Sequence, residues 1–119
     1  MLEKVLRIVL LYDFYGSLLT DKQSLSIEMH YLNDLSLAEI AGELKVSRQA
    51  VYDILKRAEQ IMVDYENKLK FIERYQGDQQ TIQHICDLLK KMPGQVGDIP
   101  ELNLAVTKLQ GMLDYSKEV

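Results

Sequence analysis

One polar stretch of this 119-residue chain combines the side-chain types that proteins use to contact nucleic acids. Arginine can pair with guanine through two hydrogen bonds, and glutamine can pair with adenine in the same way. Arg48 and Gln49 are adjacent here and directly follow Ser47, a residue type that caps helices. The candidate DNA-binding set contains eight residues: Lys45, Ser47, Arg48, Gln49, Tyr52, Asp53, Lys56 and Arg57.

These eight side chains divide by the contact that each could make. We expect three of them to contact base edges: Arg48, Gln49 and Tyr52. We expect four to hold phosphates: Lys45, Ser47, Lys56 and Arg57. Asp53 would repel phosphate or accept a hydrogen bond from the cytosine amine. The alternative interpretation is that the set is only the solvated face of a helix.

The segment from Leu35 to Arg57 predicts the elements that position this set, a helix, a tight turn and a second helix. Ser36 and Glu39 form a capping box for the first helix, and Ser47 caps the second. The apolar residues have the spacing of a small interhelical core: Ile40, Ala41, Leu44, Val46, Val51 and Ile54. Lys45 stands at the turn, where glycine is usual and a left-handed lysine costs roughly 1 kcal/mol. The segment therefore predicts a helix-turn-helix, which places its second helix in the DNA major groove.

Helical patterns continue on both sides of this segment. A helix is expected over 2–18, and another from the Thr20–Gln23 capping box to the break at Asn33–Asp34. No Pro or Gly occurs between Ser47 and Gly77, so the second helix should run for roughly 28 residues. Two more helices should follow, separated by a loop at 93–98, and the last should begin at Ile99–Pro100. We expect an all-α fold with about six helices, a helix-turn-helix domain at 1–62, and an extension for packing or oligomerisation at 63–119.

Charge argues against strong DNA binding by a single copy. The net charge is −4, and residues 20–61 hold five basic and seven acidic side chains. Affinity for DNA depends on how many phosphates are neutralised, and two copies would double that number. The apolar stripe from Val51 to Ile72 could pack against the C-terminal helices or a second copy, so we expect a homodimer.

Composition limits the other classes of function. The single Cys excludes an internal disulfide and fits a cytoplasmic protein, and no segment has the roughly 20 apolar residues of a membrane span. His84 and Cys86 point in different directions on a helix, so we expect no metal and no other cofactor. Because the acidic residues are scattered and no catalytic set is found, we expect no enzyme activity.

Three segments together resemble the YlxM-like family of small bacterial helix-turn-helix proteins: YDFYGSLLTDKQ (Tyr12–Gln23), VSRQAVYDILKRAE (Val46–Glu59) and DYENKL (Asp64–Leu69). Thr20 to Glu59 is also similar to the region of sigma factors that binds the promoter −35 element. The resemblance implies a cytoplasmic regulator encoded beside the signal-recognition-particle GTPase. The partner it implies is DNA, or alternatively that GTPase or its RNA-bound form, without sequence-specific DNA binding. Residues 76–119 contain no matching motif.

Overall fold

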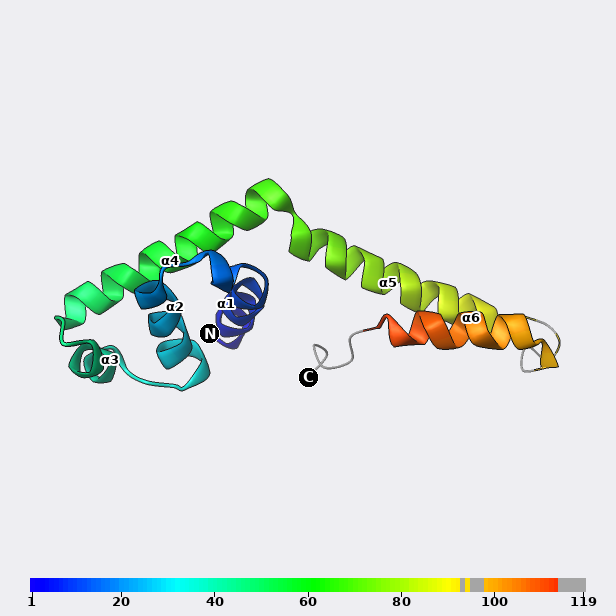
Figure 1. The fold of residues 1–119 in the computed structure, drawn as a ribbon, viewed down its shortest axis with the longest axis horizontal. Coiled ribbons are helices and arrows are strands. Elements are labelled where there is room, and N and C mark those ends of the chain that lie inside the picture. The colour runs from blue at the N-terminus through cyan, green and yellow to red at the C-terminus, as the bar shows by residue number, and fades with distance from the viewer. Residues whose placement is uncertain (93, 95–97, 114–119) are drawn as a thin grey trace. The chain divides into compact units, whose positions relative to one another are not determined.

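The computed structural model describes residues 1–92, 94 and 98–113, and these residues form helices and connecting turns without a strand (Figure 1). The chain divides into two compact units, Met1–Ile72 and the part from Glu73 onward. The predicted all-α helix-turn-helix fold is confirmed. None of the helices described is long and apolar enough to cross a membrane.

The first unit contains four α-helices in the order that the sequence predicts. Helix α1 is Leu2–Tyr15, followed by a 3-10 turn (η1, Gly16–Leu18), and α2 is Asp21–Ile27, which continues as a π-helical turn (η2, Glu28–Leu32). Helices α3 (Leu37–Leu44) and α4 (Arg48–Leu69) follow. Both predicted capping boxes are present, since the hydroxyls of Thr20 and Ser36 accept N–H bonds from Gln23 and Glu39.

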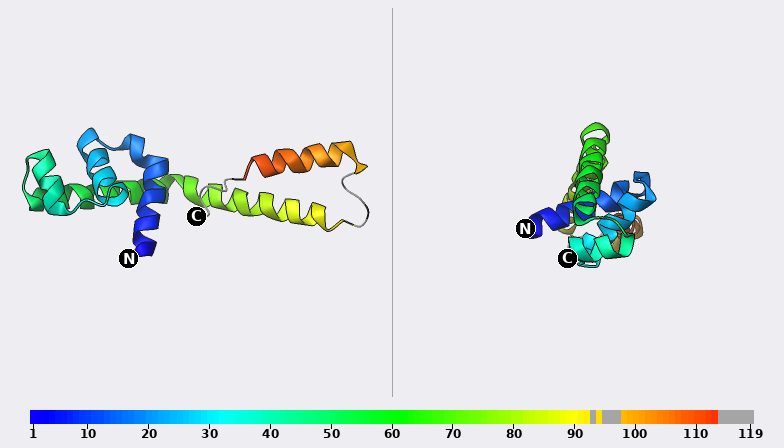
Figure 2. Two further views of the ribbon diagram at one scale, coloured as in Figure 1. Left: turned by 90° about the horizontal axis from the view of Figure 1, so that it is seen from below. Right: turned by 90° about the vertical axis from the view of Figure 1, so that its left-hand side faces the viewer.

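Helix α4 is the element against which α1, α2 and α3 all pack (Figures 1 and 2). Its buried side chains recur every three or four residues and so share one face: Val51, Leu55, Ala58 and Met62. The shorter helices contribute the fully buried Leu11, Ile27 and Ile40 to the same core. Burial of one face of α4 leaves the opposite face of its first turns in solvent.

Helix α4 ends earlier than the sequence predicts. Lys70 adopts the left-handed conformation, with φ 58°, and α5 (Phe71–Lys90) begins directly after it. The carboxylate of Glu66, 7% exposed, accepts the Tyr15 O–H at 2.5 Å and the Ile72 N–H at 3.0 Å. The prediction of one helix from Ser47 to Gly77 is therefore wrong, because a buried carboxylate binds the backbone just past Lys70. Gly77 lies within α5.

The second unit is a pair of antiparallel helices, with α5 beside α6 (Pro100–Gly111) (Figures 1 and 2). Near the middle of α5, the Gln79 side-chain amide donates to the carbonyl oxygen of Met112, just past the end of α6, at 2.9 Å. Ile82 and Cys86 are buried between the helices. The predicted helix start at Ile99–Pro100 is confirmed, and most of the loop predicted at 93–98 lies outside the described residues.

Candidate nucleic-acid interface

The turn between α3 and α4 closes around a lysine. Lys45 has φ 57° and ψ 44°, which is the left-handed conformation, and its N–H donates to the Ala41 carbonyl oxygen. The Val46 N–H donates to the same oxygen at 3.1 Å. Ser47 then begins α4 by accepting the Ala50 N–H at 3.0 Å. The two helices are thus joined by the short turn that a helix-turn-helix requires.

The interhelical core differs from the predicted one at a single residue. Ile40 and Val51 are fully buried, and Ala41, Leu44 and Val46 pack against the same cluster. Ile54 is only partly buried and lies outside that cluster, whereas Leu55 is 4% exposed. Leu55 follows Val51 by one helical turn and so shares its face.

All eight residues of the predicted DNA-binding set are exposed. On α4, four of them lie opposite the buried stripe: Gln49, Asp53, Lys56 and Arg57. Tyr52 lies to one side of that stripe, and Arg48 precedes Val51 by one turn, beside Tyr52. Tyr52 is 44% exposed despite its large ring. The side chains of Lys45 and Ser47 precede α4 at the same end. The structure therefore brings the predicted residues together on one surface, the α4 outer face.

Two pairs of side chains, each one helical turn apart, order the α4 outer face. The Gln49 amide nitrogen donates to the Asp53 carboxylate at 3.0 Å. The ammonium of Lys56 lies 5.6 Å from the centroid of the Tyr52 ring, within the range of a cation–π contact. These pairs limit the rotamers of four side chains before any ligand binds.

Two acidic side chains of the first unit, Glu59 and Glu39, make contacts away from the α4 outer face, whereas Glu43 is exposed just before the turn. Glu59 accepts the Tyr31 O–H at 2.8 Å and lies 3.6 Å from the Lys4 ammonium, so it faces η2 and α1. Glu39 accepts the Ser36 N–H at 3.0 Å, and this bond lowers the pKa of its carboxyl. From 45 to 57 the chain has four basic residues and one acid, Asp53. A charge count over 20–61 hides this local excess.

Tyrosine–carboxylate contacts that the sequence does not reveal hold the first unit together. The Tyr12 hydroxyl lies 2.5 Å from both the Ser24 hydroxyl and the Glu28 carboxylate. Burial, and then the bond to Glu59, raise the pKa of Tyr31. No spacing rule could identify such pairs, because the tyrosine and its carboxylate are separated by 16 to 51 residues. These contacts hold helices in position and do not form a binding site.

Known proteins match nearly the whole chain. A family model described as "Putative helix-turn-helix protein, YlxM / p13 like" (UPF0122) matches residues 2–99. A UPF0122 protein of Bacillus mycoides is 43% identical over 109 residues, which is 92% of this chain and 99% of that protein. UPF0122 proteins of Bacillus thuringiensis and Bacillus cereus are 42% identical with the same coverage.

Proposed function

This chain belongs to the UPF0122 family of YlxM/p13-like helix-turn-helix proteins, and on that premise we propose that it is a DNA-binding regulatory protein. The α4 outer face is the proposed contact surface. In this arrangement the first two turns of α4 enter the major groove, where base edges differ between all four base pairs.

The local charge of the α4 outer face is the observation that favours DNA. Four cations stand against one acid between residues 45 and 57, although the chain as a whole carries a charge of −4. Phosphate contacts depend on the charges that reach the backbone, so this local excess counts for more than the total. Lys45, Lys56 and Arg57 would hold phosphates. The backbone N–H groups in the first turn of α4 that Ser47 does not cap would do the same.

Base contacts would come from the centre of the same surface. Arg48 can form a bidentate pair with guanine, for which a loss of about 1–3 kcal/mol is expected on truncation. Tyr52 can contact a base or the thymine methyl group. Because one N–H of the Gln49 side-chain amide is donated to Asp53, the acceptor oxygens of this pair can accept from the amino group of cytosine or adenine.

Selection from a random duplex library, followed by a salt titration of the selected duplex, tests this function. We expect a preferred sequence at about 100 mM salt and a log–log slope of about −3 to −4 for each copy bound. Arg48→Ala should weaken binding about 5- to 150-fold and relax the preference at one position. The matched control is Lys22→Ala, which removes an exposed cation on α2. Binding without any sequence preference would overturn the proposal.

The family resemblance extends the proposal to genes of the signal-recognition-particle pathway, with the chain acting as a homodimer. A second candidate function is a protein-interaction module that acts on the signal-recognition-particle GTPase or its ribonucleoprotein. It is favoured by the charge outside 45–57, where ten basic residues stand against seventeen acidic ones. Capture of that GTPase unchanged by Arg48→Ala with Gln49→Ala, but lost on neutralising surface acids, would select this candidate.

A further inference from the structure

The single acid of the α4 outer face lies at the centre of that face. With 100° between successive residues, the direction opposite the buried stripe of α4 passes within about 10° of Asp53 and about 30° of Gln49. Lys56 and Arg57 lie one turn farther along, about 60° to one side of Asp53 and about 40° to the other. The two cations therefore stand toward the edges of the face, and the carboxylate stands at its middle.

The Asp53 carboxylate is held in place but can still bind a ligand. Asp53 is exposed, and one of its oxygens accepts the Gln49 side-chain N–H at 3.0 Å. Among the described residues it forms no ion pair, although Lys56 and Arg57 are close by in the sequence. Since both oxygens of an ionised carboxylate accept hydrogen bonds, the second oxygen of Asp53 is left to accept from a ligand.

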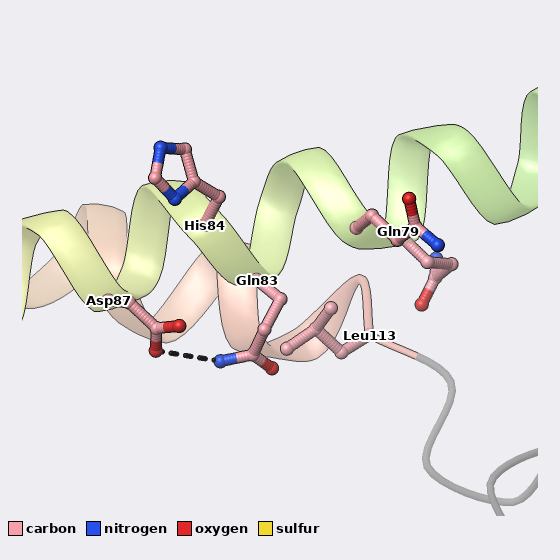
Figure 3. A pocket seen from close by; sticks show the side chains of 6 residues that line it. Gln79, Gln83, His84, Asp87 and Leu113 are labelled. Atoms are coloured by element: carbon pink, nitrogen blue, oxygen red, sulfur yellow. Dashed lines mark hydrogen bonds between the residues drawn. The ribbon is translucent and has the colours of Figure 1, made fainter.

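The same pair of residue types occurs twice more in the chain, away from the helix-turn-helix. Gln60 donates to Asp64 at 2.9 Å, and Gln83 donates to Asp87 at 2.9 Å where both line a hollow of about 310 Å³ in the second unit (Figure 3). Such pairs stabilise helix surfaces weakly wherever they occur. Asp64 lies about 16 Å along the axis from the first pair, farther than the roughly 12 Å width of the major groove. Only the first pair stands where a helix-turn-helix contacts bases.

A carboxylate at the centre of this face would meet base edges rather than phosphates. Phosphates line the two rims of the major groove, where cations toward the edges of the face would reach them. On the groove floor, the only hydrogen-bond donors are the amines of cytosine and adenine. The adenine amine lies beside the acceptor N7, which repels a carboxylate, whereas the cytosine amine has no acceptor next to it on its own base. Guanine and thymine present acceptor atoms, which also repel a carboxylate.

We propose that Asp53 determines specificity on the α4 outer face: it accepts from the amine of one cytosine and excludes the other three bases from that position. This selection requires the DNA binding of the proposed function and names the base that is read. Exclusion is the larger effect, because a carboxylate set against an acceptor loses water and gains no hydrogen bond. Gln49 is a positioning residue, since its N–H fixes the direction of the carboxylate. Arg48 lies about 140° away around α4, so its contact with guanine is separate.

Selection from a random duplex library with the wild type and three variants tests this role of Asp53. The wild type should recover duplexes that share a cytosine at one position. Asp53→Asn should lose that preference, because an amide can also donate to the acceptors of guanine and thymine. Asp64→Asn and Asp87→Asn remove the same charge from the other two pairs and should recover the wild-type sequence. All three aspartates are exposed, so the variants should fold like the wild type.

Two methylated cytosines at the selected position separate the amine from the rest of the base. N4-methylcytosine still pairs with guanine, but its methyl group replaces the N–H that faces the major groove. In contrast, 5-methylcytosine carries a methyl group of the same size and keeps that N–H. Wild-type binding should be about 5- to 150-fold weaker with N4-methylcytosine than with 5-methylcytosine, as for a mismatched base pair. In Asp53→Asn the difference between the two duplexes should be much smaller.

The results separate the role of Asp53 from the DNA binding that it requires. A wild type without any sequence preference would overturn both. A cytosine preference that persists in Asp53→Asn, or a preference for adenine that this variant removes, would overturn the role of Asp53 alone. Gln49→Ala should weaken the cytosine preference without replacing it by another base. Loss of the preference in Gln49→Ala but not in Asp53→Asn would show that Gln49 reads the base, and would overturn the proposal.

Discussion

Lys45 is a lysine at a backbone position that glycine adopts at no steric cost. Its φ of 57° sets the turn between α3 and α4. Lys45→Gly should raise the free energy of unfolding by up to about 1 kcal/mol, a gain reduced by the greater freedom of glycine in the unfolded chain. Lys45→Ala should give no gain, because alanine is strained there too. Urea unfolding curves of the three proteins measure this, and equal gains from both substitutions would contradict it.

Asp53 is the single acid among the cations of the α4 outer face. Asp53→Asn removes its charge and keeps an oxygen that can accept from Gln49. Affinity for duplexes of any sequence should rise, by up to about tenfold, and the gain should shrink as salt screens the surface. Fluorescence anisotropy at two salt concentrations measures both effects. Asp64→Asn, farther along α4 and bonded to Gln60 in the same way, is the matched control.

The sequence predicts which side chains of α4 are exposed but not how they are paired. Exposure of Gln49 and Lys56 follows from their spacing relative to Val51 and Leu55, whereas Arg48 shares a side with Val51 and is exposed in the first turn of α4. The spacing does not predict that Glu59 turns away from that surface, because its partners Tyr31 and Lys4 lie on other elements. A charge count along the chain therefore underestimated how basic the surface is.

Helix starts were predictable and one helix end was not. The helix starts at Thr20 and Ser36 can be predicted from the local sequence, because the capping residue and its partner are three positions apart. The end of α4 depends on Glu66 binding the Ile72 N–H and on Tyr15 from α1. Gly77, the sequence signal for a break, is exposed within α5, and a glycine there costs a helix only about 1 kcal/mol.

Glu66 should be the residue on which the α4–α5 junction depends most. Glu66→Ala leaves the Ile72 N–H and the Tyr15 hydroxyl without this acceptor, and should cost about 2–4 kcal/mol of stability. Glu66→Gln keeps an acceptor oxygen and should cost about half as much. Chemical denaturation followed by far-ultraviolet circular dichroism compares them. A cost below about 1 kcal/mol for the alanine variant would be inconsistent with this role.

The Ser36–Glu39 capping box should make α3 sensitive to acid. The Ser36 N–H lowers the pKa of the Glu39 carboxyl in the folded chain. Its stabilisation is therefore complete above the ordinary carboxyl pKa of about 4.3, and is lost as the pH falls through the lowered value. In Glu39→Gln, the side-chain amide oxygen can still accept the Ser36 N–H but carries no charge. The difference in Tm between wild type and this variant should shrink below about pH 4, and a constant difference would contradict the assignment.

The number of copies that bind one DNA site gives a prediction for the molecule as a whole. If two copies bind one site, the log–log salt slope should approach about −7, and one bound copy should give about half of that. A slope near −3 to −4 for a protein that sediments as two copies would mean that only one α4 outer face contacts DNA at a time.

The central position of α4 also has a consequence for the order of events during synthesis. Helices α1, α2 and α3 pack against a helix that is translated after all of them. At about 5–20 residues per second, the ribosome needs roughly 1–4 s to add the 22 residues of α4. Throughout that interval Ile8, Leu11, Ile27 and Ile40 have no core to enter. The nascent chain should therefore be a substrate for ribosome-associated chaperones until α4 emerges, and a translational pause within the α4 codons would prolong that exposure.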